Sequence, residues 1–120
     1  MISIIIPIYN EEDNIIDIYK SIESALEKLN YEVIFINDGS TDNSEAEILK
    51  IIEKSNKYKL ISLRKNYGQT TAMQAGFDKA KGSIIIPMDG DLQNDPNDIP
   101  MLIDKLKEGY DVVSGWRKNR

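Results

Sequence analysis

Two aspartates that flank a glycine, Asp89 and Asp91, are the residues of this sequence best suited to chemistry. They follow three consecutive isoleucines at positions 84–86, and β-branched residues favour a strand. In open α/β sheets, ligands bind beyond the carboxyl ends of the strands, which is where both carboxylates fall. Carboxylates this close repel each other unless a proton or a cation lies between them. A divalent metal, with Gln93 as a further oxygen ligand, is therefore predicted to hold a phosphorylated ligand here.

A polar turn after a strand is the other interpretation of this tripeptide, because aspartate and glycine are common turn residues. A calcium-binding loop is excluded, since Asn94 stands where such a loop needs glycine and Pro100 where it needs glutamate. The position of the two aspartates directly after a long apolar strand favours the metal site.

Composition narrows the possible chemistry. The 120 residues suffice for one domain with a core, and 41% hydrophobic and 29% charged residues are ordinary for a soluble globular protein. A net charge of −5 argues against nucleic acid as a partner. The sequence has no cysteine and no histidine, so disulfides, thiolate sites and imidazole bases are excluded. Carboxylates and metals remain.

The apolar segments predict an α/β fold with a mostly parallel sheet in three layers, α/β/α. Strands are predicted at residues 3–8, 31–37, 60–63, 84–88 and 111–116, alternating with helices. Such alternation implies right-handed crossover units. In the first strand, Pro7 cannot donate to a ladder, so pairing is expected to weaken there.

The helices between these strands differ in character. The first has apolar residues at spacings of three and four over positions 15–29. The second is expected to turn Ala46, Leu49 and Ile52 inward. The third, from Thr70, is rich in small residues that allow close approach to the sheet, and Gly82 is placed to end it.

Other polar residues also follow predicted strands. Asp38 would extend the acidic edge formed by the two later aspartates, although the segment around it also reads as a turn with a helix cap. Tyr9 is suited either to packing on its neighbours or to stacking on a nucleobase. Arg64 and Arg117 follow the third and fifth strands and are candidates for phosphate contacts, or else part of solvated charge runs.

The segment at residues 67–70 leads into a helix and offers only a weak anion-binding signal. It lacks the lysine of a phosphate-binding loop and the glycine triplet of a dinucleotide-binding turn.

Five motifs in this order resemble family 2 glycosyltransferases of the GT-A fold. They are Pro7-Ile8-Tyr9-Asn10-Glu11, Asn37-Asp38-Gly39-Ser40-Thr41-Asp42, Arg64 with Asn66 and Gly68, Asp89-Gly90-Asp91-Leu92-Gln93, and Ser114-Gly115-Trp116-Arg117. Within the family they most resemble the polyprenyl-phosphate branch, which includes dolichol-phosphate mannose synthase. The resemblance spans essentially the whole chain and implies a Rossmann-like nucleotide-sugar-binding fold.

The resemblance also implies roles for individual residues. Asp38 would hydrogen-bond the base edge, and Arg117 would contact the phosphate of the acceptor. Asp91 and Gln93 would hold Mg²⁺ or Mn²⁺ on the diphosphate, with Asp89 on the ribose and metal side; Asp89, Asp91 and Arg117 form the catalytic set. The residues implied to line the nucleotide and sugar pocket are Pro7, Tyr9, Asn10, Glu11, Arg64 and Gly68.

The implied reaction is inverting transfer of a hexose from a UDP- or GDP-sugar to an acceptor, a polyprenyl phosphate by resemblance. Such an acceptor is already an anion and needs no general base. Residues 1–120 would be the nucleotide-sugar-binding part of a longer protein at the cytoplasmic face of a membrane, reached through elements beyond Arg120. The open sheet edge after Trp116 would allow a homo-oligomer. The alternatives are a nucleotide-binding fragment that transfers nothing, and a phosphatase using an aspartyl-phosphate.

Overall fold

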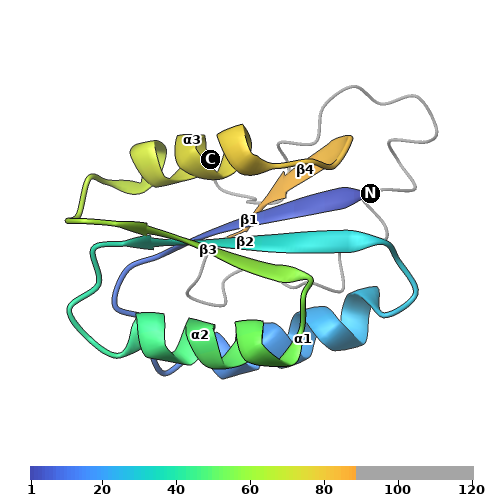
Figure 1. Cartoon of the computed structure of the whole chain (residues 1–120), viewed down its shortest axis with the longest axis horizontal. Coiled ribbons are helices and arrows are strands. Elements are labelled where there is room, and N and C mark those ends of the chain that lie inside the picture. Colours follow the sequence, from blue (N-terminus) through green and yellow to red (C-terminus); the bar gives the residue numbers. More distant parts are fainter. Residues whose placement is uncertain (89–120) are drawn as a thin grey trace.

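The computed structural model describes residues 1–88 and shows a parallel sheet between two layers of helices (Figure 1). The strands are β1 (Ile2–Ile8), β2 (Tyr31–Asp38), β3 (Tyr58–Leu63) and β4 (Ile84–Pro87). The helices are α1 (Ile15–Leu26), α2 (Ser44–Lys54) and α3 (Gln69–Lys79). The strand order is β3-β2-β1-β4, and every pairing is parallel. The predicted α/β architecture is confirmed, whereas the strand predicted at 111–116 lies outside the described residues.

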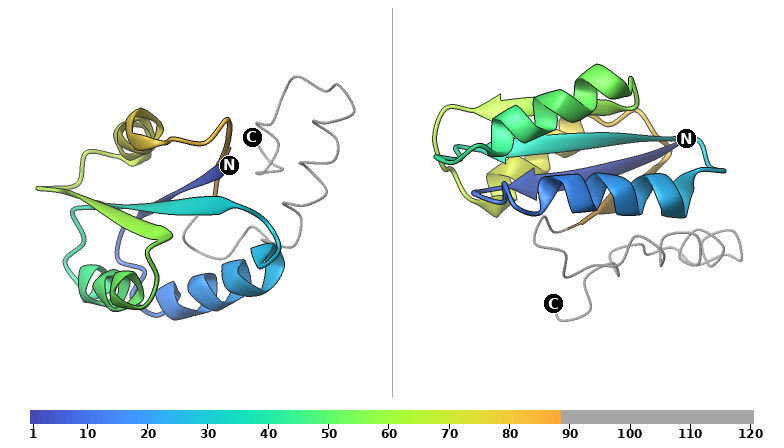
Figure 2. Two further views of the ribbon diagram at one scale, coloured as in Figure 1. Left: turned by 45° about the vertical axis from the view of Figure 1, so that its right-hand side comes forward. Right: turned by 90° about the horizontal axis from the view of Figure 1, so that it is seen from below.

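Helices cover the two faces of the sheet unequally. Helices α1 and α2 lie side by side on one face and α3 lies on the other (Figures 1 and 2). Successive side chains of a strand point to opposite faces, so in β1 Ile4 and Ile6 pack in the core with α1 and α2, whereas Ile5 packs with Ala72 of α3. Coverage on both faces explains why β1 and β2 are almost continuously apolar.

Pro7 marks the point where pairing on one side of β1 stops. On the β4 side the register ends with Ile5 opposite Pro87, and the Met88 amide donates to the Ile5 carbonyl at 2.9 Å. On the β2 side the register continues through Pro7 to Ile8. The weakened pairing expected at Pro7 is therefore found on one side only.

Helix α3 approaches the sheet closely through Gly76. A Cβ at this position would lie 2.4 Å from a methyl carbon of Ile5 and 2.8 Å from one of Ile36. The small-residue surface of α3 thus serves close packing, as predicted. The helix ends at Lys79, with Ala80 in an extended conformation as its C-cap, so the prediction that Gly82 ends it is wrong.

The inward face of α2 also differs from the prediction. Ser44, Ile48 and Ile51 are buried, whereas Leu49 is 45% exposed and Ala46 is exposed. Of the three residues predicted to face inward, Ile52 alone packs against the core, where it is half-buried. The reason is the buried first residue of the helix: the Ser44 hydroxyl accepts a hydrogen bond from the Glu11 amide, which fixes that face toward the sheet.

Strand β4 is less enclosed than its three isoleucines imply. Of these, Ile86 is fully buried, while Ile84 and Ile85 are half-buried. Within residues 1–88, β4 forms one edge of the sheet and the central strands are β1 and β2. Over the same residues, no helix has the length and apolar character needed to cross a membrane.

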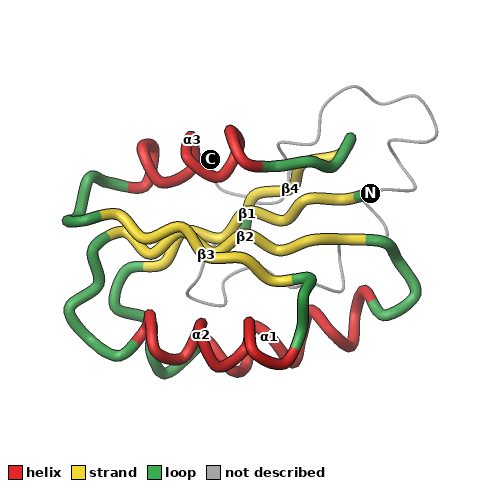
Figure 3. The backbone as a smooth tube through the Cα atoms, viewed as in Figure 1, coloured by secondary structure: helices red, strands yellow, loops and turns green. Residues whose placement is uncertain are grey.

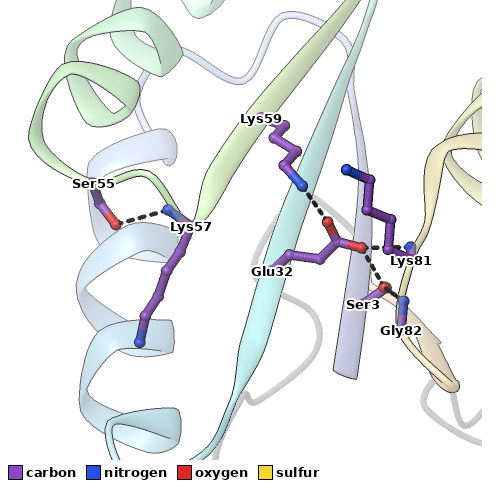
Figure 4. A network of polar contacts seen from close by, with 7 residues as sticks. All are labelled: Ser3, Glu32, Ser55, Lys57, Lys59, Lys81 and Gly82. Atoms are coloured by element: carbon purple, nitrogen blue, oxygen red, sulfur yellow. Dashed lines mark hydrogen bonds and ion pairs between the residues drawn. The ribbon is translucent and has the colours of Figure 1, made fainter. Parts of the chain in front are cut away.

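A buried carboxylate closes the amino-terminal edge of the sheet (Figure 4). Glu32 is 3% exposed and accepts from the Ser3 hydroxyl at 2.6 Å and the Lys81 amide at 2.7 Å, while its other oxygen lies 2.6 Å from the Lys59 ammonium. Gly82 fits beside it because a Cβ there would lie 2.7 Å from the Ser3 oxygen. Burial alone would raise the pKa of Glu32, but these hydrogen bonds and the Lys59 charge lower it to about 2.

Candidate nucleotide-binding edge

The sheet register brings the ends of three strands together at the carboxyl edge. Ile8 of β1 lies opposite Asn37 of β2, and Asp38 lies opposite Leu63 of β3. Tyr9 and Arg64 are therefore the first residues beyond β1 and β3, on either side of the end of β2. The loops that leave these strands gather at the left of Figure 3. The predicted convergence of these side chains on one edge follows from this register.

Hydrogen bonds join the loop after β1 to the loop after β2. Three consecutive amides of the first loop donate to side-chain oxygens of the second loop or of Ser44, the first residue of α2. The bonds are Asn10 N–H to Ser40 Oγ at 3.0 Å, Glu11 N–H to Ser44 Oγ at 2.9 Å and Glu12 N–H to Asp42 Oδ2 at 3.2 Å. Because these amides already have acceptors, they are not a free cradle for a phosphate.

Asn10 holds the same two loops together from the other direction. Its side-chain oxygen accepts from the amides of Thr41 at 2.8 Å and Asp42 at 3.3 Å. Its backbone has a φ of 55°, a left-handed conformation that asparagine tolerates better than most residues. Asn10 thus has a structural role between the loops, and it does not cap α1, whose N-cap is Asn14.

Asp42 remains ionised within this junction. Its partial burial would raise its pKa, but hydrogen bonds from the Ser44 hydroxyl and amide and from the Glu12 amide outweigh that effect and lower the pKa. Its Oδ1 accepts the Ser44 amide at 2.9 Å at the start of α2. A negative charge at the first turn of a helix is favourable.

Asp38 is buried at the end of β2 and binds the loop after β3. It is 3% exposed, and its two oxygens accept the amides of Tyr67 at 2.8 Å and Gly68 at 3.0 Å. No cation forms an ion pair with it within the described part of the chain. The hydrogen bond from Asp38 to a base edge, predicted by resemblance, stays a prediction; the structure adds two protein partners.

Gly39 lets these two loops meet. It has a φ of +73°, and a Cβ built on it would lie 2.3 Å from the carbonyl carbon of Lys65 and 2.4 Å from the nitrogen of Asn66. Gly68, the N-cap residue of α3, has a φ of +100°. Both positions therefore favour glycine for conformational reasons.

The remaining predicted pocket residues differ in exposure. Tyr9 is 46% exposed and Arg64 is exposed, so both side chains are accessible at this edge. Pro7 is half-buried in β1. Glu11 is half-buried, and one of its carboxylate oxygens accepts from the Asn14 side chain at 2.8 Å.

The predicted metal and acceptor residues lie outside the described residues. These are Asp89, Asp91, Gln93 and Arg117. The last described residue, Met88, is buried, and its amide donates to the Ile5 carbonyl of β1. Residues 1–88 contain no group of three or more acidic, histidine or cysteine side chains arranged for a metal. The carboxylate and amide oxygens predicted after Met88 suit Mg²⁺ or Mn²⁺ chemically.

The sequence did not reveal the partners of Ser40, Asp42 and Ser44. Their turn and capping propensities were visible, but their bonds cross to a loop about 30 residues earlier in the chain. No local pattern encodes such a pairing, because it depends on the register of β1 against β2.

Several solved structures are similar to this chain. A mannosyltransferase from Pyrobaculum calidifontis, solved with GDP-mannose and Mn²⁺, superposes with a TM-score of 0.77 at 22% identity, over 88% of this chain and 32% of that one. Staphylococcus aureus TarS, solved with UDP-GlcNAc, gives a TM-score of 0.66 at 26% identity, over 87% of this chain and 31% of that one. The fold is that of the GT-A glycosyltransferases.

Sequence comparison identifies the family. The model of glycosyl transferase family 2 matches residues 3–120, so the chain belongs to that family. An uncharacterized glycosyltransferase of Synechocystis sp. is 40% identical over 121 residues, which cover 99% of this chain and 38% of the relative. The chain thus spans about two fifths of the length of that relative.

Proposed function

We propose that this chain is the nucleotide-sugar-binding part of a glycosyltransferase that uses a UDP- or GDP-hexose. The observation that carries the proposal is the register that places Tyr9, Asp38 and Arg64 at the ends of three adjacent strands. The bound donors named for the Pyrobaculum and Staphylococcus structures support this class of ligand.

Each of the three residues has a proposed part in binding the nucleotide. The exposed Tyr9 ring stacks on the base. Asp38 accepts an N–H of the base; each carboxylate oxygen has about two acceptor positions and uses one for a backbone amide, which leaves one on each. Uracil and guanine both present a ring N–H for this purpose. The Arg64 guanidinium borders the diphosphate.

A divalent cation is proposed at Asp89, Asp91 and Gln93, where it would neutralise the nucleoside diphosphate as it leaves. The Mn²⁺ in the Pyrobaculum structure, and in Mycobacterium tuberculosis glucosyl-3-phosphoglycerate synthase with UDP, supports this proposal. The backbone amides of residues 10–12 also support a metal ion. Because they already donate to side-chain oxygens, they are not available to bind the phosphates.

The acceptor is proposed to be a polyprenyl phosphate, with inversion at the anomeric carbon. An acceptor of this kind is ionised at neutral pH, so no side chain has to remove a proton from it. Arg117 is proposed to contact its phosphate. Contact with the cytoplasmic face of a membrane, and any homo-oligomer, belong to the same proposal.

Calorimetric titration with UDP and with GDP, each with and without Mn²⁺, tests the donor site. We expect metal-dependent binding of one of the two nucleotides and its loss in Asp91→Asn. Binding that is unchanged in Asp91→Asn would remove this residue from the metal site. Binding of neither nucleotide by the folded chain would contradict the proposal that this part of the protein suffices for nucleotide binding.

A binding unit that transfers nothing by itself is the second candidate, favoured by the chain spanning only 38% of its Synechocystis relative. A hexose-transfer assay on this chain and on a version extended to the relative's length separates the two candidates. Transfer by the extended protein alone would support the first candidate, part of a longer transferase, whereas nucleotide binding without transfer in both versions would support the binding unit. In the extended protein, Arg117→Ala should spare nucleotide binding and impair acceptor use.

A further inference from the structure

We propose that the Asp38 carboxylate is a positioning group, which holds residues 64–68 in the arrangement that binds the nucleotide. The proposal rests on the proposed function, in which this loop borders the donor. It assigns Asp38 a second role, exerted through the loop, besides any contact with the base.

The carboxylate accepts hydrogen bonds from two consecutive amides of the loop. Tyr67 N–H lies 2.8 Å from Oδ1 and Gly68 N–H lies 3.0 Å from Oδ2. A hydrogen bond to a charged acceptor is stronger than one between two neutral groups. Losing such a bond destabilises the protein most when the acceptor is buried. With Asp38 only 3% exposed, the two bonds fix the end of the loop firmly.

The loop is fixed at both ends by the same residue of β2. At its start, Leu63 lies opposite Asp38 in the sheet register. At its end, Gly68 is bonded to the Asp38 side chain and is also the N-cap of α3, where its carbonyl accepts the Ala72 amide at 3.1 Å. The carboxylate therefore fixes the end of the loop and the first turn of α3, while the backbone pairing of β2 with β3 fixes its start beside Arg64.

Gly39 completes the contact and provides a way to separate the two roles of Asp38. Its missing Cβ leaves room for the backbone at Lys65 and Asn66, which a methyl group would meet at 2.3–2.4 Å. Gly39→Ala is therefore expected to displace the loop while leaving the Asp38 carboxylate in place for a base. Asp38→Asn removes the charge and turns an amide donor toward one of the loop N–H groups.

Amide hydrogen exchange on the nucleotide-free chain tests the anchoring. We expect exchange at Tyr67 and Gly68 to accelerate about tenfold or more in Asp38→Asn and in Gly39→Ala. Ser40→Ala is the matched control in the same loop: it removes a bond to Asn10 and should leave both rates unchanged. Unchanged rates in a folded Asp38→Asn chain would overturn the proposal. If circular dichroism shows that this variant does not fold, the rates in Gly39→Ala decide.

Titration with UDP and GDP plus Mn²⁺ tests whether the anchoring matters for binding. Positioning predicts that Gly39→Ala weakens nucleotide binding about tenfold, although the acidic side chain is intact. Faster exchange with unchanged affinity would overturn positioning and leave a purely structural contact. A wild-type chain that binds neither nucleotide would contradict the proposed function and the nucleotide half of this proposal, while the exchange rates still decide the anchoring.

Discussion

Strand β2 carries a buried carboxylate at each end, and the protein stabilises the two by different means. Glu32, at the amino-terminal edge, and Asp38, at the carboxyl-terminal edge, are each 3% exposed. Glu32 has a hydroxyl, an amide and the Lys59 ammonium as partners. Asp38 has two amides and, within residues 1–88, no cationic partner.

This difference in partners distinguishes the amino-terminal edge at Glu32, which we call the closed edge, from the carboxyl-terminal edge at Asp38, which can receive a ligand. A buried charge is tolerated when hydrogen bonds and a counter-charge compensate its lost hydration. At Glu32 that compensation is complete within the protein. At Asp38 the two amides supply hydrogen bonds, and within residues 1–88 no cation supplies a counter-charge. Asp38, without a counter-charge in the described residues, thus supports the proposal of a ligand that binds together with a cation and donates N–H groups.

Glu32→Ala is expected to produce the largest effect, because it leaves the Ser3 hydroxyl and the Lys81 amide without their acceptor and breaks the ion pair with Lys59. We expect the free energy of unfolding in urea to fall by about 4 kcal/mol. Glu47→Ala is the matched control, since its partner Lys50 is 63% exposed and their ion pair should be worth about 0.5 kcal/mol or less. Equal losses in both variants would contradict a special role for the closed edge.

Acid should weaken the closed edge in a defined range of pH. The pKa of Glu32 falls from an ordinary 4.5 to about 2 on folding, so the unfolded chain binds the proton more readily. The resulting stability is fully present above about pH 4.5 and is lost as pH falls toward 2. Between pH 6 and pH 2, the free energy of unfolding of the wild type should fall by about 3 kcal/mol more than that of Glu32→Gln. Parallel pH profiles would refute this assignment.

Asp38→Ala should destabilise the protein less than Glu32→Ala does. We expect the free energy of unfolding in urea to fall by about 2 kcal/mol. Within residues 1–88 the substitution breaks no ion pair, and it frees the amide of Tyr67, which is 50% exposed, and that of its neighbour Gly68. A loss exceeding that of Glu32→Ala would show that the carboxyl edge, too, is part of the structural core. The comparison between the two edges would then fail.

The smallest effect is expected for Ser40→Ala, which removes an exposed hydrogen bond from the Asn10 amide. The change in unfolding free energy should stay within about 0.5 kcal/mol, because Asn10 keeps its side-chain bonds to Thr41 and Asp42. A change above 1 kcal/mol, measured in the same urea titration, would mean that the junction between the two loops acts as one cooperative unit.

Local patterns in the sequence were sufficient for the four strands within residues 1–88 and for the start of α1, although β3 begins two residues earlier than predicted and α1 ends at Leu26. The runs at β1 and β2 are apolar throughout because both faces are covered, and the isoleucines of α1 repeat at helical spacing, with Ile15, Ile18 and Ile22 buried. The pattern of α2 was ambiguous, since apolar residues occupy two stripes. The burial of Ser44, which depends on a contact with Glu11, selected the stripe with Ile48 and Ile51.

The sequence by itself determined the α/β fold class, the family and the presence of polar residues after each strand, because hydrophobic periodicity and motif order are local properties of the chain. Only the tertiary structure decided what those polar residues touch. Asp38 meets amides 29 and 30 residues away, and Glu32 meets Lys81 49 residues away. Such contacts arise from the register of neighbouring strands, which brings together residues far apart in the sequence, and they need the space left by Gly39 and Gly82.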